Sequence, residues 1–409
     1  MKKAPDLLDL LVWPVDVVQE LLWFVCSVIL ALVARWKPKP IDVGLGPEPL
    51  INNIYHRKAL IQAGFTAETF VSRTYFITQN FDHIIPAGDG ALGKFIGRLR
   101  LFWHAVSRYK IIYIYFNGGP FFYTSFVWCA EPMLLRLARV RVVVMPFGGD
   151  VQDFTRSRNL LFKHAMTIDY PGHALRRKRV ADQIDLWTRN ADHILSGCEW
   201  VDYMYHWDTL QIAHFSIDTE ALAARAAMAG DGQPVPPAEG RPTPERPLRV
   251  LHAPNHRAIK GTGAFLRAVE ELAAEGVPIE LEMVEFVTND EVLQAILRSD
   301  VVLDQLIVGW YAMFAIEAMA MGKPVLCFLR SDLMELYIGA GLVEEGEIPI
   351  VNAHLLSVKE ALRSLAATDR AELAALGRRS QDYVRRRHSL TAIGSVFARI
   401  NSELGVHPT

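Results

Sequence analysis

The stretch LHAPNHRAIKGT, residues 251–262, joins an apolar run typical of a strand to a run typical of a helix. The strand is predicted over residues 248–252, and Arg257 and Lys260 follow it in a loop that precedes the helix. Free backbone N–H groups at a helix start and the helix dipole add to the charge of two such cations, so together they can hold a diphosphate. We therefore predict that Arg257 and Lys260 bind the phosphates of a ligand.

A second stretch, EAMAMGKPVL at residues 317–326, places one carboxylate, Glu317, on a helix of small and apolar residues that ends at Gly322. A carboxylate there can accept hydrogen bonds from the hydroxyls of a sugar or a ribose. Its apolar neighbours imply that Glu317 either faces a cleft at the helix start or is buried at a cost. Together the two stretches indicate a nucleotide-sugar site.

The composition limits the class of protein. A chain of 409 residues with 51% hydrophobic and 22% charged residues is long enough for two globular domains. The formal net charge of −2 argues against a general nucleic-acid binder. The four cysteines are scattered and form no CxxC pair, which favours free thiols in a reducing compartment and disfavours a structural zinc. We expect no metal site.

The first 40 residues differ from the rest of the chain. Residues 21–34 carry no charge, lysines precede them, and three basic residues follow between positions 35 and 39. A membrane span needs about 20 apolar residues, so this run is short for one. Tryptophans near its ends favour a peripheral or monotopic membrane contact on the cytoplasmic face of the inner or plasma membrane. The alternative is a helix packed on the protein's own core, in a chain that is soluble in the cytoplasm.

After residue 40, short β-rich runs alternate with amphipathic helical stretches, which predicts parallel sheets covered on both faces. The strands are expected at 41–43, 74–77, 111–115, 140–145, 193–195, 248–252, 279–284, 301–303, 324–328 and 348–351. Residues 229–247 contain six prolines and are typical of a linker or an exposed loop. A long last helix is expected around 370–404.

The predicted fold class is α/β, with two doubly wound, Rossmann-like domains that face each other across a cleft. Ligands bind outside the carboxyl ends of parallel strands, so the cleft between the two domains is the expected site. The predicted parts are a hydrophobic extension (1–40), a first domain (41–221), a linker (222–247), a second domain (248–385) and a helix that packs back on the first domain (386–409).

The chain resembles the GT-B glycosyltransferases, in particular the large retaining group of the group-1 or family-4 type. The segments that carry the resemblance in the second half are 252–262, 300–305, 309–311, 317–325 and 349–353, and those in the first half, which match more loosely, are 44–47, 147–150 and 190–195. The resemblance implies an enzyme of the hexosyltransferase type that moves a sugar from a nucleotide-diphosphate donor to a glycan or lipid-linked acceptor. It also implies that the first domain binds the acceptor and the second domain binds the nucleotide-sugar donor. It further implies retention of configuration, cell-surface polysaccharide or glycolipid synthesis as the setting, and no cofactor or metal.

In this resemblance Lys260 and Arg257 would stabilise the leaving diphosphate as the glycosidic bond breaks. Glu317 would bind the ribose. The family often carries two glutamates separated by seven residues, and the first of these positions holds Gly309 here. The donor sugar therefore stays open.

The other candidate residues each have a structural alternative. Asp150 could bind a sugar hydroxyl, act as the base if the enzyme inverts, or cap a helix that begins near residue 151. Gly44 and Gly46 could form a loop that lets the backbone approach a phosphate or the acceptor, or a plain turn. The remaining donor-binding candidates are His252, His256, Gly261, Thr262, Gly309 and Tyr311, although lone histidines and aromatic residues beside a glycine are more often structural.

Two other functions remain open. One is a nucleotide-sugar epimerase on the same fold, which would need no acceptor. The other is a catalytically inactive sugar- or nucleotide-binding partner in a polysaccharide assembly complex, consistent with Gly309 in place of a glutamate. A dinucleotide-dependent oxidoreductase is disfavoured because no GxGxxG motif opens a helix after a strand.

Overall fold

The computed structural model describes the backbone of residues 7–74, 79–228 and 240–408, and the side chains of these residues from position 17 onward. Most of the strand expected at 74–77 and part of the proline-rich stretch at 229–247 lie outside the described residues.

The first domain is built on a sheet of seven parallel strands in the order β3-β2-β1-β4-β5-β6-β7. Alternate residues of the inner strand β5 point to opposite faces, so Val142 and Val144 join one hydrophobic cluster and Val143 and Met145 join another. The strands are β1 (Ile41–Leu45), β2 (Ala67–Val71), β3 (His83–Ile84), β4 (Tyr109–Tyr115), β5 (Arg141–Met145), β6 (His193–Ser196) and β7 (Thr209–Leu210).

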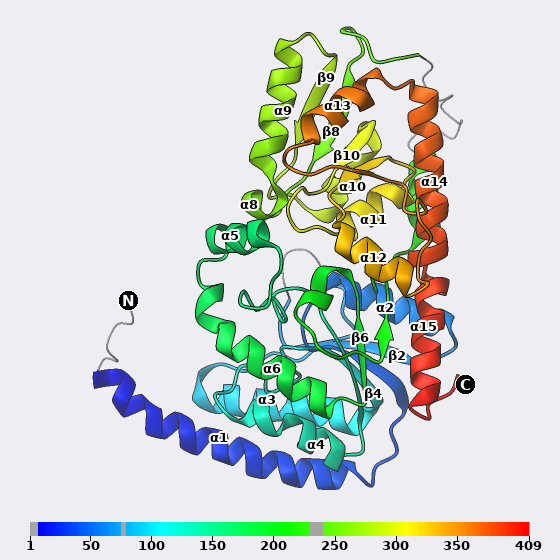
Figure 1. The fold of residues 1–409 in the computed structure, drawn as a ribbon. Coiled ribbons are helices and arrows are strands. Elements are labelled where there is room, and N and C mark those ends of the chain that lie inside the picture. The colour runs from blue at the N-terminus through cyan, green and yellow to red at the C-terminus, as the bar shows by residue number, and fades with distance from the viewer. Residues whose placement is uncertain (1–6, 75–78, 229–239, 409) are drawn as a thin grey trace.

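Helices cover both faces of this sheet (Figure 1). One face carries α2 and α15, and the other carries α3, α4 and α6. The helices of the first domain are α2 (Ile51–Gln62), α3 (Gly90–Arg108), α4 (Glu131–Leu137), α5 (Leu160–Asp169) and α6 (Arg177–Asn190). Three short 3₁₀ helices, η1 (Val127–Ala130), η2 (His173–Arg176) and η3 (Cys198–Asp202), lie between them.

The second domain has a sheet of five parallel strands in the order β12-β11-β10-β8-β9. Helices α9 and α13 pack together on one face, and α10, α11 and α14 cover the other (Figure 1). The strands are β8 (Leu248–His252), β9 (Ile279–Met283), β10 (Val301–Leu303), β11 (Val325–Cys327) and β12 (Ile350–Asn352). The helices are α8 (Arg257–Lys260), α9 (Thr262–Ala274), α10 (Asn289–Arg298), α11 (Met313–Ala320), α12 (Ser331–Gly339) and α13 (Val358–Ala367).

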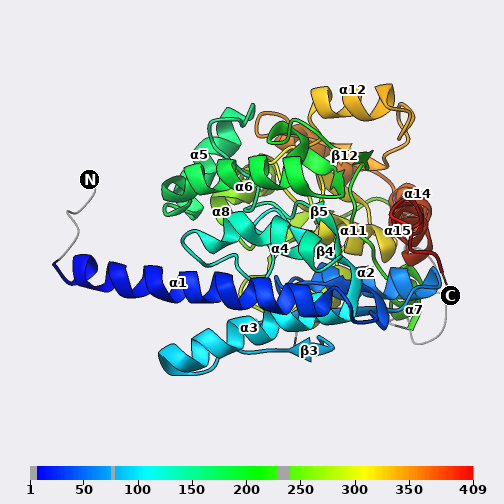
Figure 2. The ribbon, with the colours of Figure 1, turned by 90° about the horizontal axis from the view of Figure 1, so that it is seen from below.

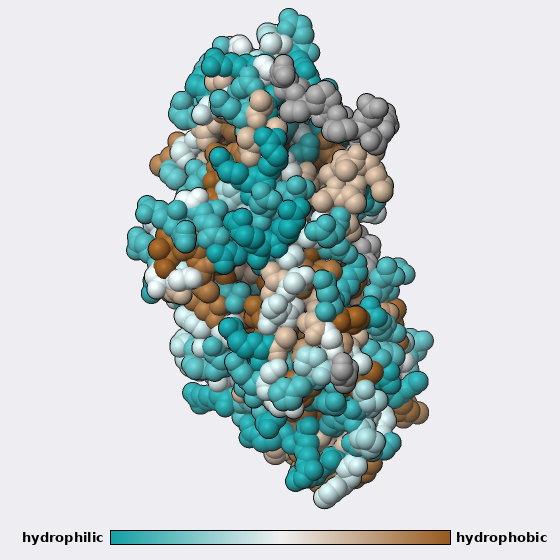
Figure 3. Space-filling model, turned by 90° about the vertical axis from the view of Figure 1, so that its right-hand side faces the viewer, coloured by the Kyte–Doolittle hydropathy of each residue, from teal (hydrophilic) through white to brown (hydrophobic). Residues whose placement is uncertain are grey.

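Two helices connect the domains near the C-terminus, where one long helix was predicted. α14 (Arg370–His388) packs on α11, and α15 (Leu390–Glu403) packs on α2 of the first domain. The chain bends at Ser389, whose hydroxyl accepts a hydrogen bond from the N–H of Ala392 at 3.1 Å and caps α15. The face seen in Figure 3 is mostly hydrophilic, with hydrophobic residues in scattered patches.

The predicted linker begins later than residue 222, because α7 (Thr219–Met228) continues through its first seven residues and packs against α11 and α14. At the other end of the chain, α1 (Leu7–Ala34) is longer than the uncharged run that predicted it and lies across α3 and α4 (Figure 2). By length and composition, residues 17–34 could cross a membrane, although a core helix or a signal sequence meets the same criteria.

Candidate functional site

A cavity of about 680 Å³ lies between the two domains, where the carboxyl ends of both sheets face each other. The residues that follow strands β1, β4, β5 and β6 line it from the first domain, and those that follow β8 and β10 line it from the second. They include Glu48, Asn117, Asp150 and Glu199 on one side and His256, Ile259, Lys260 and Val308 on the other.

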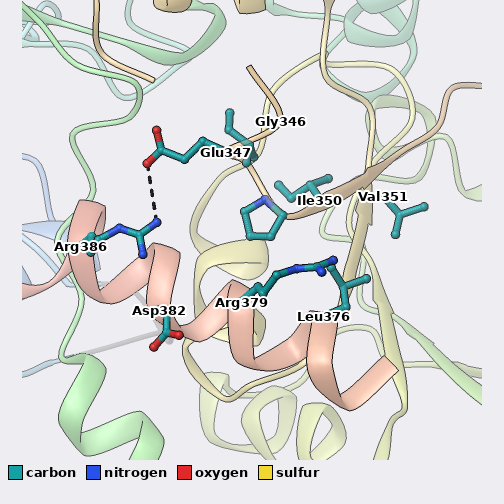
Figure 4. A pocket seen from close by; sticks show the side chains of 10 residues that line it. Gly346, Glu347, Ile350, Val351, Leu376, Arg379, Asp382 and Arg386 are labelled. Atoms are coloured by element: carbon teal, nitrogen blue, oxygen red, sulfur yellow. Dashed lines mark ion pairs between the residues drawn. The ribbon is translucent and has the colours of Figure 1, made fainter. Parts of the chain in front are cut away.

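A second cavity, of about 540 Å³, lies on the outside of the second domain between the segment leading into β12 and helix α14 (Figure 4). Its acidic residue Glu347 is bound by Arg386 at 3.7 Å and by Arg387 at 2.7 Å. These charges therefore hold α14 to the domain. The inter-domain cavity is the candidate site because it combines the strand ends of both sheets.

Lys260 lines the inter-domain cavity from the second domain. The residues predicted as a loop form the short helix α8, which ends at Gly261 in a left-handed conformation (φ 75°) before α9 begins. The Lys260 ammonium lies 2.6 Å from Oδ1 of Asp304, a fully buried carboxylate directly after β10. The sequence analysis did not single out Asp304, although a carboxylate at the end of a buried strand is a recognisable signal for a site.

Arg257 does not join Lys260. Its side chain is 61% exposed, donates a 2.8 Å hydrogen bond from Nε to Glu285 and forms a second ion pair with the other oxygen of that carboxylate. This pairing lowers the pKa of Glu285. Because Arg257 is the first residue of α8 and Glu285 follows β9, the guanidinium is held at the side of the domain and does not line the cavity.

His252 and Thr262 support the site from inside the domain. Both are buried, and the His252 ring bonds the carbonyl of Leu303 through Nδ1 at 2.7 Å and the Thr262 hydroxyl through Nε2 at 3.0 Å. Burial lowers the pKa of His252 to about 4, so the ring is neutral at pH 7. The two residues join β8, β10 and α9, and neither lines the cavity, contrary to the predicted binding role.

His256 does line the cavity, where the two domains touch. Its Nε2 forms a hydrogen bond with the Tyr170 hydroxyl of the first domain. One residue earlier, the Asp169 carboxylate accepts a 2.8 Å hydrogen bond from the N–H of Ile259. The end of α5 therefore contacts α8 directly across the cleft.

Glu317 is buried in the middle of α11, and Gly309, separated from Glu317 by seven residues, occupies the position that the sequence resemblance compares with a glutamate. The Glu317 carboxylate accepts a 3.1 Å hydrogen bond from Asn289, and burial raises its pKa to about 7. It is not among the residues that line the cavity. A Cβ at Gly309 (φ 94°) would overlap the side chain of Arg330, which pairs with Asp202 of the first domain at 2.6 Å.

Three other predicted site residues, Tyr311, Gly44 and Gly46, have packing roles in the fold. Tyr311 is buried, and its hydroxyl bonds that of Tyr383 at 2.7 Å and His388 Nε2 at 3.0 Å, so it cannot stack on a ligand. Gly44 lies within β1 and not in a loop, and a Cβ there would overlap the Tyr109 ring. A Cβ at Gly46 would overlap the carbonyl of Phe70, so close packing of strands explains both glycines.

Asp150 lines the cavity but is occupied by the backbone. Its Oδ1 accepts hydrogen bonds from the N–H groups of Phe147 (3.0 Å) and Gly148 (2.9 Å), and its Oδ2 accepts one from Phe116 (3.0 Å). Burial raises its pKa to about 7, and these hydrogen bonds oppose the shift. Asp150 thus orders the loops after β4 and β5, and no helix begins near residue 151 for it to cap.

Two cavity carboxylates were missed by the sequence analysis. Glu199 follows β6, is mostly buried, and has its pKa raised to about 7 by burial. Glu48 follows β1, accepts a 2.9 Å hydrogen bond from Asn117, and has its pKa raised by burial. Their positions directly after buried strands could have identified them.

One group of metal-ligand residue types lies elsewhere, at the β2–β3 edge of the first sheet. The ligand atoms of Glu68, His83 and His104 all lie within 4.8 Å of one another. However, Arg108 binds both oxygens of Glu68, at 2.5 and 2.6 Å, and His104 bonds the Tyr109 hydroxyl. These partners give the cluster a structural explanation.

No family model matches the chain, and no curated protein sequence matches it. Solved structures similar to it include sucrose-phosphate synthase from Thermosynechococcus elongatus, with a TM-score of 0.56 at 15% identity over 90% of this chain and 99% of that one. HepE from Anabaena, in complex with UDP, has a TM-score of 0.54 at 12% identity over 90% of this chain and 100% of that one. An α-glucosyltransferase in complex with UDP and DNA has a TM-score of 0.53 at 10% identity over 89% of this chain and 100% of that one.

Two parallel-sheet α/β domains facing across a cleft, matched over almost the whole chain, confirm the predicted fold class. This chain has the GT-B fold of the glycosyltransferases.

Proposed function

We propose that the protein is a glycosyltransferase that moves a sugar from a nucleotide-diphosphate sugar to a glycan or lipid-linked acceptor in cell-surface polysaccharide or glycolipid synthesis. The observation that carries this proposal is Lys260, a cation on the floor of the inter-domain cavity, held by the buried Asp304 at the strand ends of a GT-B fold. UDP in two of the similar structures supports a nucleoside diphosphate as the ligand.

In the proposed reaction, Lys260 stabilises the negative charge that develops on the leaving diphosphate, so the step needs no metal ion. The group-1 or family-4 resemblance supports retention of configuration, with the leaving diphosphate assisting deprotonation of the acceptor. If the enzyme inverts instead, Glu199 is a better candidate base than Asp150. Both carboxylates line the cavity and both have a pKa raised to about 7 by burial, but the oxygens of Asp150 are occupied by hydrogen bonds from three backbone N–H groups.

Membrane contact is part of the proposal, with the protein on the cytoplasmic face of the inner or plasma membrane. The apolar residues on the exposed side of α1 support it. A soluble cytoplasmic protein is the alternative. The contact would bring the enzyme to a lipid-linked acceptor.

A thermal-shift screen against UDP, ADP, GDP, CDP and inorganic phosphate tests the site. A ligand present at 100 times its dissociation constant stabilises the folded state by about 2.7 kcal/mol, so a matching diphosphate should raise the Tm clearly. The shift should be lost in Lys260→Ala. If no nucleoside diphosphate raises the Tm of the wild-type protein, the proposed donor class is wrong.

Turnover separates the enzyme classes. With the nucleotide sugar of the matching base, release of nucleoside diphosphate that depends on an added acceptor supports the transferase. A free epimer of the nucleotide sugar in a donor-only incubation would identify an epimerase. Binding without turnover across a panel of donors and acceptors would identify an inactive binding partner.

A further inference from the structure

One face of α1 is firmly attached to the first domain. The buried carboxylate of Glu20 accepts hydrogen bonds from the N–H groups of Ser125, Phe126 (2.8 Å) and Val127 (3.2 Å), at the start of η1. Trp23 donates a 3.0 Å hydrogen bond to the carbonyl of Phe95 and stacks on its ring. A carboxylate buried against three N–H groups is costly to remove from its partners, so this face stays on the protein.

The opposite face of α1 is apolar and uncovered. Its residues are spaced four and three apart, which places them in one stripe along the helix. The stripe consists of Val18, Leu22, Val25, Ile29 and Leu32 on α1 and of Trp36 two residues beyond its end, with exposed fractions between 45% and 78%. A contiguous exposed stripe of this kind marks a membrane or protein interaction surface.

The neighbouring helix α3 adds exposed apolar residues and basic residues beside α1. Leu92 and Ile96 of α3 are 71% and 44% exposed, and α3 packs beside α1 (Figure 2). Residues 17–40 and 90–108 contain seven lysines and arginines and one acidic residue, the buried Glu20; Asp9 and Asp16 lie earlier in α1, and Asp89 precedes α3. We call the stripe together with the exposed residues of α3 the α1–α3 surface. An apolar stripe with basic neighbours complements an anionic lipid surface.

We propose that the α1–α3 surface docks on an anionic bilayer with α1 lying in the plane of the membrane, so that α1 enters one leaflet with its stripe and does not cross. A crossing helix would have to bring Glu20 into hydrocarbon and leave the N–H groups of Ser125, Phe126 and Val127 without their acceptor. An in-plane helix keeps these bonds and buries the stripe at the boundary of head groups and acyl chains.

The docked helix is also connected to the cleft. The segment that Glu20 binds continues from Phe122 and Tyr123, which line the inter-domain cavity. Arg179 holds the same segment by donating to the carbonyls of Phe122 at 2.8 Å and Thr124 at 3.2 Å. One ordered loop therefore links the docked helix to the lining of the cavity. This step, which rests on the proposed function, fits an amphiphilic acceptor whose head group enters the cavity while its tail stays in the leaflet.

Co-sedimentation of the full-length protein with vesicles tests the surface. The anionic vesicles consist of phosphatidylcholine with about a third of phosphatidylglycerol, which gives a clearly anionic surface. They should bind the wild-type protein more tightly than vesicles of phosphatidylcholine alone. Val25→Glu with Ile29→Glu should weaken binding to the anionic vesicles by about tenfold or more. Leu356→Glu, at a 92% exposed leucine of the second domain, is the matched control and should leave binding unchanged. Equal binding by all three proteins would overturn the proposal.

Fluorophores at two exposed positions of α1 test its orientation and leave its buried contacts with the first domain unchanged. In a background with Cys26 and Cys129 replaced by Ser, Val18→Cys and Leu32→Cys each receive a polarity-sensitive fluorophore. The two positions are 14 residues apart, about 21 Å along a helix. An in-plane α1 predicts equal shallow depths and full quenching of both by dithionite added outside the vesicles. Different depths, or protection of one position, would show a crossing helix and overturn the proposal. Neither result depends on the UDP thermal shift, so this inference and the proposed function can fail separately.

Discussion

Lys260 and Asp304 form an ion pair of 2.6 Å, in which the carboxylate is fully buried and the ammonium opens to the inter-domain cavity. The carboxylate fixes the position of the Lys260 ammonium between β8 and β10. An ammonium has three donors, so the pair leaves Lys260 able to bind an anion in the cavity as well. The same residue thus serves the packing of the domain and the proposed chemistry.

Replacing Lys260 should affect turnover and stability separately. Lys260→Ala should lower turnover by on the order of 10²-fold or more if the ammonium stabilises the leaving diphosphate. It also leaves the buried Asp304 carboxylate without its ion-pair partner, which costs about 3 kcal/mol or more of unfolding free energy. The double variant Lys260→Ala with Asp304→Asn should regain part of the stability but none of the turnover, as measured by urea unfolding and nucleotide release. Unchanged turnover in the single variant would remove Lys260 from the mechanism.

Arg257 should matter much less than Lys260. Its guanidinium is exposed and paired with Glu285 at the side of the domain. Arg257→Ala should therefore keep turnover within about fivefold of the wild-type protein, as expected for a surface pair. A loss as large as that of Lys260→Ala would mean that Arg257 leaves Glu285 when the donor binds.

The sequence predicted the fold well and the site only in part, for a physical reason. Apolar strands such as 111–115 are visible because burial on both faces requires uninterrupted apolar residues. β2 was missed because its sequence, AETFV, carries Glu68, which pairs with Arg108 at the sheet edge. Residue type does not reveal which way a side chain points, so Tyr311 was predicted to face a ligand although it faces α14.

Tyr311→Phe tests that correction. The change removes a buried hydroxyl bonded to Tyr383 and His388, which should lower the free energy of unfolding by about 1–3 kcal/mol. The dissociation constant of the nucleoside diphosphate should stay the same, because the ring does not line the cavity. Isothermal titration and urea unfolding measure the two effects. Weaker nucleotide binding at unchanged stability would restore the predicted binding role.

Glu317→Ala tests the proposed contact with the ribose. If the carboxylate accepts hydrogen bonds from ribose hydroxyls, the variant should bind the nucleoside diphosphate about tenfold more weakly, the loss expected for one hydrogen bond to a charged group. Inorganic phosphate, which has no ribose, is the matched ligand and should bind equally well to both proteins. An unaltered nucleotide dissociation constant would place Glu317 outside the site.

The pH dependence of stability gives an independent reading of Glu317. Burial raises its pKa from 4.5 to about 7, so the folded protein keeps the proton over a range in which the unfolded chain has lost it. Stability should therefore fall as pH rises from about 4.5 to 7, by roughly 3 kcal/mol from this group at pH 8.

Glu317→Gln keeps the shape of the side chain and cannot ionise. The free energies of unfolding of the two proteins should be similar at pH 4.5, whereas the variant should be the more stable at pH 8. Asp150 and Glu199, whose pKa values burial also raises, are present in both proteins, so the difference between them isolates Glu317. Urea unfolding at the two pH values measures it. A difference that does not change with pH would mean that Glu317 is already ionised in the folded protein, stabilised by more than its one hydrogen bond from Asn289.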